Sequence, residues 1–218
     1  MSGVWAVVPV KCFSRGKSRL RDVLSRADRE ELARSLCDRA LSVLAECDAV
    51  DGALVATDCA HVARFAESRD AIVLRDLPAA SFAQIIDRAL AALSADGASA
   101  ALVLMADLPF LTADDVRALV AALERAPLVL APDRHGRGTN ALAVSPPERI
   151  ATCFGSETSF ALHVARARES RLDVAVHRSE GVGFDLDSPA DLDVARAYAD
   201  RGAFLSWNRK RPSRVRAA

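Results

Sequence analysis

The stretch Ala-Ala-Leu-Val-Leu-Met-Ala-Asp-Leu-Pro, residues 100–109, decides the fold because it predicts a buried strand that ends at an acidic residue. Its first six residues are all apolar, as in a strand covered on both faces of a parallel sheet. Residues 112–125 then show a helical pattern, with Thr112 as the N-cap and Asp115 in a relative of the capping box. A buried strand followed by a helix is typical of α/β proteins.

The alternation of strand and helix patterns continues in both directions from this stretch. Short apolar runs predict further strands at residues 4–10, 53–57, 71–74, 128–131, 140–144 and 172–177. Apolar residues at helical spacing predict helices at residues 28–47, 59–68, 81–93, 156–169 and 188–199. This order indicates an α/β fold in which helices cover both faces of a parallel sheet.

The composition is that of one globular domain. The chain has 218 residues, of which 51% are hydrophobic, and its 29 basic residues balance 29 acidic ones. This balance excludes a globally basic nucleic-acid-binding protein, and the apolar fraction excludes a disordered body. No apolar run approaches the roughly 20 residues that span a bilayer, and the N-terminus lacks the pattern of a signal peptide. We therefore expect a cytoplasmic protein without nucleic-acid or membrane partners; its oligomeric state is open, with a homodimer as one alternative.

The chain end and the cysteines allow two further predictions. Residues 1–201 are predicted to form the domain, and residues 202–218 a basic, flexible tail in solvent rather than a nucleic-acid-binding arm. The five cysteines are an odd number, and no two of them form a Cys-x-x-Cys pair. This pattern predicts free thiols and argues against a zinc knuckle or a disulfide framework.

A cluster of cations follows the first predicted strand. Lys11, Lys17 and Arg19 lie in this loop with two further arginines. Ligands of a parallel α/β sheet bind at the carboxyl ends of its strands, and a polyphosphate needs cations there. Because Gly16 and Lys17 lack the spacing of a P-loop, we predict a polyphosphate site of another kind. The alternative is a solvated basic loop.

Aspartates follow two distant segments. Asp107 comes directly after the most apolar strand, and Asp185 and Asp187 alternate on an extended segment before the last helix. Mg²⁺ prefers one or two carboxylates together with phosphate oxygens, so these residues are candidate metal ligands. The alternatives are that Asp107 only forms the turn before proline, and that Asp187 or Ser188 only caps the helix.

A polar loop and the start of a helix form a third candidate site. Residues 132–140 bring together two arginines, one of them Arg134, with glycines and Thr139. Residues 154–160 open a predicted helix whose N–H groups and hydroxyls can hold an anion. Together they predict a site for a small phosphorylated acid. His163 lies one helical turn beyond Ser159, either as a structural histidine or as a ligand contact.

Motifs from all three candidate sites occur in a recognisable order. They are Val-Pro-Val-Lys at 8–11, Lys-Ser-Arg-Leu at 17–20, Asp-Leu-Pro at 107–109, Pro-Asp-Arg at 132–134, Gly-Thr-Asn-Ala-Leu at 138–142, Ser-Phe at 159–160 with His163, and Asp-Leu-Asp-Ser-Pro at 185–189. The ordered set resembles the 2-phospho-L-lactate guanylyltransferase family of coenzyme F420 biosynthesis, which includes phosphoenolpyruvate and 3-phospho-D-glycerate guanylyltransferases.

The resemblance implies a fold and a reaction. The fold would be a three-layer, Rossmann-like nucleotidyltransferase fold of the glycosyltransferase-A type, with a mostly parallel central sheet. The reaction would transfer GMP from GTP to a small phosphorylated acid, with Mg²⁺ as cofactor and pyrophosphate as the second product. The acceptor would be 2-phospho-L-lactate, phosphoenolpyruvate or 3-phospho-D-glycerate. These three acids differ by only a few atoms, and the sequence does not identify which of them is used.

The resemblance also implies roles for individual residues. Lys17 and Arg19 would hold the GTP phosphates and act in catalysis, with Lys11 nearby, and Asp107 would bind the metal with Asp185 or Asp187. Thr139, Gly155 and Ser159 would hold the acceptor, with Arg134 close by; the chain is one residue longer here, so that Thr158 is an alternative to Ser159. In place of the Gly-Leu-Asn that usually contacts guanine, residues 80–84 read Ala-Ser-Phe-Ala-Gln, and Gln84 would supply the amide.

Two other functions remain open at this point. One is a nucleotidyltransferase of the same fold that acts on a molybdopterin or a sugar phosphate. It would use the same metal and GTP chemistry, but the Gly-Gly-x-Ser-x-Arg-type loop after the first strand is missing. The other is a non-catalytic nucleotide-binding regulator, against which the paired aspartates argue.

Overall fold

The computed structural model describes residues 3–75 and 80–199, and its strands form one sheet. The strands are β1 (Val4–Pro9), β2 (Gly52–Thr57), β3 (Ile72–Arg75), β4 (Ala100–Leu104), β5 (Leu128–Pro132), β6 (Thr139–Val144) and β7 (Val174–Val176). Their order is β3-β2-β1-β4-β6-β5-β7. Among the described strands only β6 runs against the others, since β4–β6 and β5–β6 are the antiparallel pairs. The predicted α/β fold with a mostly parallel sheet is confirmed.

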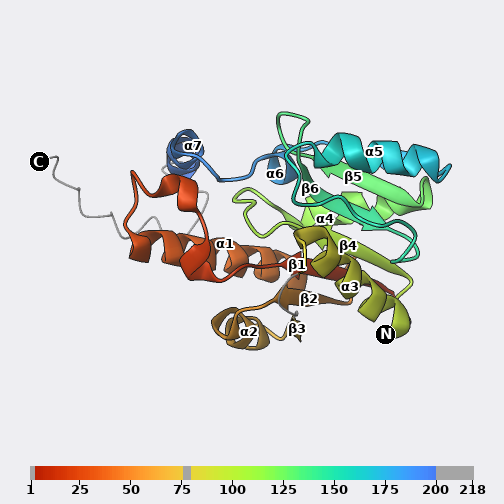
Figure 1. Cartoon of the computed structure of the whole chain (residues 1–218), viewed down its shortest axis with the longest axis horizontal. Coiled ribbons are helices and arrows are strands. Elements are labelled where there is room, and N and C mark those ends of the chain that lie inside the picture. The colour runs from red at the N-terminus through yellow and green to blue at the C-terminus, as the bar shows by residue number, and fades with distance from the viewer. Residues whose placement is uncertain (1–2, 76–79, 200–218) are drawn as a thin grey trace, which may run out of the picture.

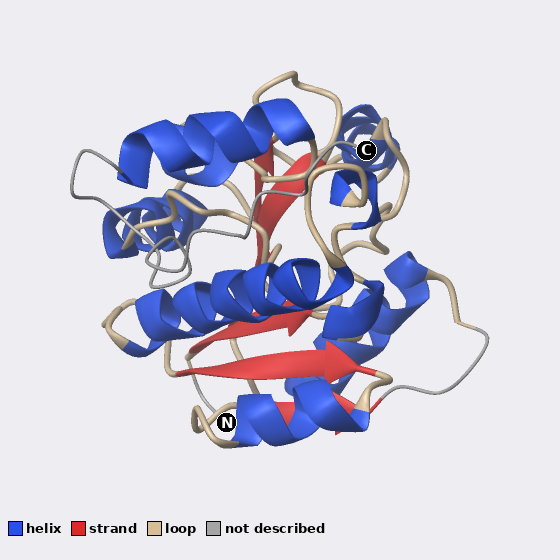
Figure 2. Ribbon diagram, turned by 90° about the vertical axis from the view of Figure 1, so that its left-hand side faces the viewer, coloured by secondary structure: helices blue, strands red, loops and turns tan. Residues whose placement is uncertain are grey.

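Helices cover both faces of this sheet (Figures 1 and 2). They are α1 (Arg26–Ala45), α2 (Ala60–Glu67), α3 (Phe82–Ala95), α4 (Ala113–Ala121), α5 (Ser159–Glu169), α6 (Glu180–Gly183) and α7 (Pro189–Ala199). Successive strand residues point to opposite faces, so Ala6 and Val8 join the core under α1, α2 and α4, whereas Val7 joins the core under α3 and α5. The three-layer architecture therefore follows from strands that are apolar on both faces.

A third apolar cluster lies away from the two sheet cores. It joins the loop after β1 and the start of α1 to the segment that leads into α7. Its members are Leu20, Leu24, Leu32, Leu36, Phe184, Leu186, Leu192 and Ala195, with Phe110 packed against them. This third cluster holds two segments together that carry candidate site residues but are far apart in the sequence.

Several predicted boundaries differ from the structure. The helix predicted at 156–169 begins at Ser159, because residue 155 has a positive φ of 93° and the hydroxyl of Ser156 bonds the backbone of Thr158. The strand predicted at 172–177 is reduced to β7. Helix α6 and two 3-10 turns, Phe13–Arg15 and Ser18–Leu20, are too short to give a periodic pattern, and the sequence did not predict them.

The prediction of free thiols is wrong for one pair. Cys12 in the loop after β1 and Cys59 at the N-cap of α2 are joined as a disulfide. Cys37, Cys47 and Cys153 are free, as predicted. The two partners are 47 residues apart in the sequence, and only the parallel pairing of β1 with β2 brings them together.

Two further predictions concern membrane-spanning segments and the C-terminal tail. None of the helices within residues 3–75 and 80–199 has the length and apolar character needed to cross a membrane. The predicted tail, residues 202–218, and the last residues of the predicted domain lie outside the described residues.

The strand order places the candidate site. β1 pairs on one side with β2 and on the other with β4, so the chain connections diverge between β1 and β4. Ligands of such sheets bind in the crevice at the carboxyl ends of the strands where this divergence occurs. Lys11 follows β1 and Asp107 follows β4, and both lie at this edge.

Candidate active site

Two adjoining cavities open at the carboxyl edge of β1 and β4. The first has a volume of about 570 Å³ and lies between the loop after β5, the start of α5 and the segment before α7. The second, of about 350 Å³, lies under the basic loop that follows β1. Lys11, Asp107 and Asp187 line both cavities, so the two form one continuous site.

Lys17 links the two acidic segments. Its Nζ lies 3.0 Å from Asp107 Oδ2 and 3.0 Å from Asp187 Oδ1, and its side chain is only 8% exposed. Burial alone would lower the pKa of Lys17, but the two carboxylates outweigh burial and raise the pKa above its ordinary value. Lys17 is therefore charged, and its third N–H proton is left for a ligand such as a phosphate oxygen. Its backbone has a left-handed φ of 52°, which turns the basic loop toward the acids.

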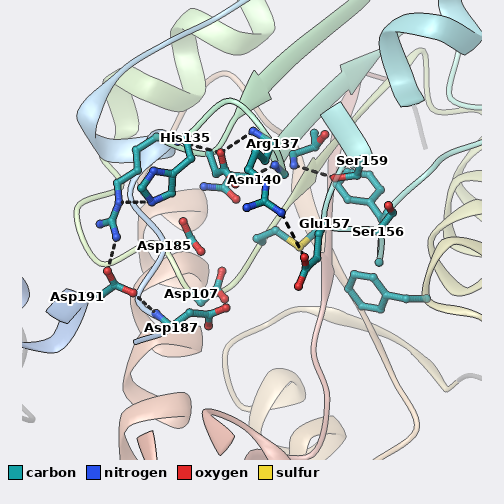
Figure 3. Close-up of a pocket in the computed structure, with 18 of the residues that line it drawn as sticks. Asp107, His135, Arg137, Asn140, Ser156, Glu157, Ser159, Asp185, Asp187 and Asp191 are labelled. Atoms are coloured by element: carbon teal, nitrogen blue, oxygen red, sulfur yellow. Dashed lines mark hydrogen bonds and ion pairs between the residues drawn. The ribbon is translucent and has the colours of Figure 1, made fainter. Parts of the chain in front are cut away.

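Asp185 completes a group of three neighbouring carboxylates. Burial and, after it, the negative charges of Asp107 and Asp187 together raise the pKa of Asp185 to about 6. Figure 3 shows the three side chains together on one side of the first cavity. Within the described ranges no three His, Cys, Asp or Glu side chains form a group that could hold a metal by themselves. The three predicted metal ligands therefore lie near one another, with Lys17 between two of them, but the described residues do not form a metal site by themselves.

A buried acid that the sequence analysis missed orients Asp187. Asp191 Oδ2 accepts the backbone N–H groups of Asp187 at 3.0 Å and Ser188 at 2.6 Å, and its other oxygen pairs with Arg134. Burial opposes the charge of Asp191, but Arg134 and the backbone donors lower its pKa below the ordinary value. The Ser-x-x-Asp spacing at 188–191 is a capping box and was the available signal. Arg134 lines the first cavity, but its guanidinium is engaged by Asp191 and lies over the Phe184 ring.

The opposite wall of the first cavity carries the predicted acceptor residues. Thr139 begins β6 and Ser159 begins α5, and the Thr139 N–H donates to Ser159 Oγ at 2.9 Å. Thr139 Oγ1 lies 3.0 Å from Nδ1 of His163, which is fully buried. Figure 3 shows Ser159 across the cavity from the acidic group.

The turn before α5 completes this wall. Gly155 lines the first cavity, and a Cβ at this position would lie 3.2 Å from Phe82 Cβ in addition to the strain of the positive φ. Ser156 and Ser159 line the cavity and Thr158 does not, which favours Ser159 as the predicted acceptor contact. The predicted use of helix N–H groups for an anion is limited, because the Ser159 and Phe160 N–H groups already bond backbone carbonyls.

The remaining predicted residues are placed as follows. Arg19 lines the first cavity, 3.7 Å from Asp187 and 3.6 Å from Glu157. Lys11 lines both cavities, and its Nζ lies 5.3 Å from the centre of the Phe82 ring. Gln84 lines neither cavity, because its Oε1 accepts the Ser81 N–H in the capping box of α3. The structure therefore does not place Gln84 among the residues that line the two cavities.

His163 makes the stability of the protein depend on pH. Burial, aided by Arg166, lowers the pKa of His163 to about 4 from 6.5, so the unfolded chain binds a proton in a range where the folded chain does not. We expect this histidine to leave stability unchanged above pH 6.5 and to reduce it by up to about 3 kcal/mol as the pH falls to 4. Urea unfolding at several pH values should show this loss in the wild type and a smaller loss in His163→Phe. Equal slopes in the two proteins would contradict the buried neutral state.

Comparison with known proteins identifies the family of this chain. The family described as "Guanylyl transferase CofC like" matches residues 4–195. The chain belongs to this family. It is 40% identical over 198 residues to the phosphoenolpyruvate guanylyltransferase of Sphaerobacter thermophilus, covering 91% of this chain and 95% of that protein. It is 36% identical over 194 residues to the protein of the same name in Conexibacter woesei, covering 88% of this chain and 86% of that protein.

Two solved structures share the fold of this chain. A Desulfovibrio desulfuricans G20 protein described as a nucleotide-diphospho-sugar transferase has a TM-score of 0.78 at 18% identity, and covers 96% of this chain and 94% of its own. A CMP:2-keto-3-deoxy-manno-octonic acid synthetase complexed with CTP has a TM-score of 0.64 at 13% identity. The match covers 92% of this chain and 100% of the synthetase chain. At these identities the comparison confirms the predicted nucleotidyltransferase-like fold.

The predicted class of enzyme is confirmed by the family. The protein is a nucleotidyltransferase of a guanylyl transferase family. The two alternatives, a molybdopterin or sugar-phosphate nucleotidyltransferase and a non-catalytic regulator, find no support in this family match.

Proposed function

We propose that this protein transfers GMP from GTP to phosphoenolpyruvate and releases pyrophosphate. The name of the most similar relatives given above supports phosphoenolpyruvate among the three acids that the sequence left open. The observation that carries the proposal is the Lys17 ammonium ion held at 3.0 Å from two aspartates of separate segments. That arrangement joins a cation for phosphates to acids for a metal at the edge of the sheet where ligands bind.

The two cavities suggest how the substrates are arranged. The GTP phosphates would lie along Lys17, Lys11 and Arg19, with the nucleoside in the second cavity. The acceptor would lie in the first cavity against Thr139 and Ser159. The two phosphate groups then meet where the cavities join, beside Asp107. This arrangement positions the reacting groups and converts an encounter of two polyanions into a reaction within one site.

The residues present fit a divalent cation. Three crowded carboxylates, one of which has its pKa raised to about 6, form an oxygen-rich and strongly negative group that a cation would stabilise. Asp107 would hold Mg²⁺ with Asp187 or Asp185, and phosphate oxygens and water would complete its coordination. A bound Mg²⁺ supplies charge neutralisation and polarises the phosphoryl group.

The chain's own residues then assist the transfer by charge and position. An oxygen of the acceptor phosphate forms a bond to the α-phosphorus of GTP. The bond from the α-phosphorus to the oxygen that it shares with the β-phosphorus breaks, and the β- and γ-phosphates leave as pyrophosphate. Because the attacking phosphate is already anionic, the reaction needs no strong general base. Lys17 and Arg19 stabilise the negative charge that builds up on the departing pyrophosphate.

The test measures pyrophosphate release with GTP, Mg²⁺ and each acid in turn. We expect phosphoenolpyruvate to give the highest kcat/KM, with 2-phospho-L-lactate and 3-phospho-D-glycerate lower by about 10-fold to 200-fold, the range for small differences in a pocket. Mass spectrometry of the product should show GMP joined to the acid. A higher kcat/KM with another acid would refute the acceptor assignment, and equal rates with CTP or ATP would refute the choice of GTP.

A further inference from the structure

The hydrogen bonds of His163 determine which of its nitrogens carries the proton. The Cys153 backbone N–H donates to His163 Nε2 at 2.8 Å, so Nε2 must be the unprotonated nitrogen. A neutral imidazole then carries its proton on Nδ1, which lies 3.0 Å from Thr139 Oγ1. Burial lowers the pKa of His163 to about 4, so the ring is neutral near pH 7. Thr139 Oγ1 therefore accepts the hydrogen bond from His163.

This direction leaves the Thr139 hydroxyl proton for another partner. Ser159 is in the same state, because its Oγ accepts the Thr139 N–H. Within the described part of the chain neither hydroxyl has a protein acceptor for its own proton. Both residues line the first cavity although they are only 5% and 3% exposed. Two hydroxyl groups thus share one arrangement, in which a protein donor fixes the oxygen and the proton is left for a ligand.

Such a pair of hydroxyl groups suits a ligand that only accepts hydrogen bonds. The carboxylate and phosphate oxygens of a phosphorylated acid have this property at neutral pH. If His163 carried its proton on Nε2 instead, the Thr139 hydroxyl would donate to Nδ1 and would present only lone pairs to the cavity. Lone pairs would repel an anionic oxygen. The tautomer of one buried histidine therefore decides whether this wall attracts the acceptor.

We infer that His163 is a positioning residue that keeps the Thr139 hydroxyl as a hydrogen-bond donor toward an anionic oxygen of the acceptor. The inference rests on the proposed function, since that function places the acceptor against Thr139. His163 itself does not line either cavity, so it acts through Thr139 and does not touch the substrate.

A purely structural role is the competing explanation. His163 also braces the segment before Gly155 through Cys153, and its ring packs edge-on against Phe154 with centroids 4.9 Å apart. Loss of that brace would disturb the cavity wall whether or not Thr139 had a hydroxyl. The two explanations therefore differ in how His163 and Thr139 depend on each other.

The test is a double-mutant cycle of His163→Phe, Thr139→Val and the double variant. The phenyl ring keeps the contact with Phe154 but has no nitrogen, and valine keeps the shape of threonine without the hydroxyl. We expect His163→Phe to raise the KM for phosphoenolpyruvate about tenfold, the effect of one hydrogen bond to a charged group, with the KM for GTP changed less than about twofold. In the Thr139→Val background, His163→Phe should add less than about twofold. An equal effect in both backgrounds would overturn the inference.

A measurement on the wild-type protein covers the case in which His163→Phe does not fold. Nitrogen-15 NMR distinguishes the two imidazole tautomers, and His163 is identified as the histidine whose signals stay constant between pH 5 and 8. We expect its proton on Nδ1; a proton on Nε2 would overturn the inference. Absence of pyrophosphate release by the wild type with every acid would instead overturn the proposed function and the inference with it. Release that survives with additive variant effects would overturn the inference alone.

Discussion

Asp107→Asn is expected to reduce turnover at least about a hundredfold while the protein stays folded, because an interaction made in the transition state is lost. Asparagine has the same shape as aspartate but no negative charge, and it offers one oxygen instead of two. It would weaken both the proposed hold on Mg²⁺ and the bond from Lys17, which donates to Asp107 Oδ2. Asp107 is partly exposed and lies in a turn after β4, so the sheet does not depend on its charge. Steady-state kcat with saturating GTP and acid, together with the thermal unfolding temperature, checks this prediction.

Asp48→Asn provides the matched control for Asp107→Asn. Asp48 is 83% exposed, pairs with Arg117 and lines neither cavity. We expect it to keep wild-type turnover, because exposed ion pairs contribute about 1 kcal/mol or less to stability. Wild-type turnover in Asp107→Asn, measured beside this control, would refute the metal assignment.

Lys17→Met is expected to reduce kcat/KM for GTP at least about a hundredfold, since it removes a charge that the departing pyrophosphate needs. Methionine retains the apolar length of the side chain but not the ammonium group. Its loss leaves Asp107 and Asp187 facing each other beside Asp185 with no cation between them, which adds repulsion toward the triphosphate. The loss should therefore appear in the KM for GTP as well as in kcat, and titration of GTP at saturating acid separates the two.

Arg21→Gln tests whether position, rather than the total charge of the loop, explains the effect at Lys17. Arg21 belongs to the same basic loop, is 76% exposed and lines neither cavity. We expect less than about a twofold change in kcat/KM, because an exposed charge is screened by salt. Comparable losses in Lys17→Met and Arg21→Gln would show that the loop attracts GTP only through its net charge.

The sheet could be predicted from the sequence because the central strands β1 and β4 are unbroken runs of apolar residues. Ala100–Leu104 is buried along its whole length, and an unbroken apolar run is what a strand between two helical layers requires. The antiparallel direction of β6 could not be predicted, because the run at Thr139–Val144 has the same apolar pattern as a parallel strand. The pairing of Cys12 with Cys59 was missed for a similar reason, since it depends on which strands are neighbours.

The candidate site was predictable in its parts but not in its connections. The position of Asp107 after the most buried strand indicated a ligand edge, and Asp187 followed from its spacing with Asp185. That Lys17 would lie between Asp107 and Asp187 depends on a left-handed backbone conformation at a non-glycine residue, which no sequence pattern indicates. The guanine contact of Gln84 was predicted only because its side chain carries an amide. The Ser-x-x-Gln spacing at 81–84 was a local signal for the capping bond that the Ser81 N–H donates to Gln84.

The third apolar cluster implies that heating would inactivate the enzyme before it unfolds. Leu20 and Leu24 pack there against Phe184 and Leu186, outside both sheet cores. This one small cluster therefore holds the basic loop against the segment that carries Asp185 and Asp187. A unit with so little apolar surface opens at a lower free energy than the central strands. Once this cluster opens, Lys17 and Asp187 separate although the sheet persists. Catalysis then stops in a molecule that still has most of its secondary structure.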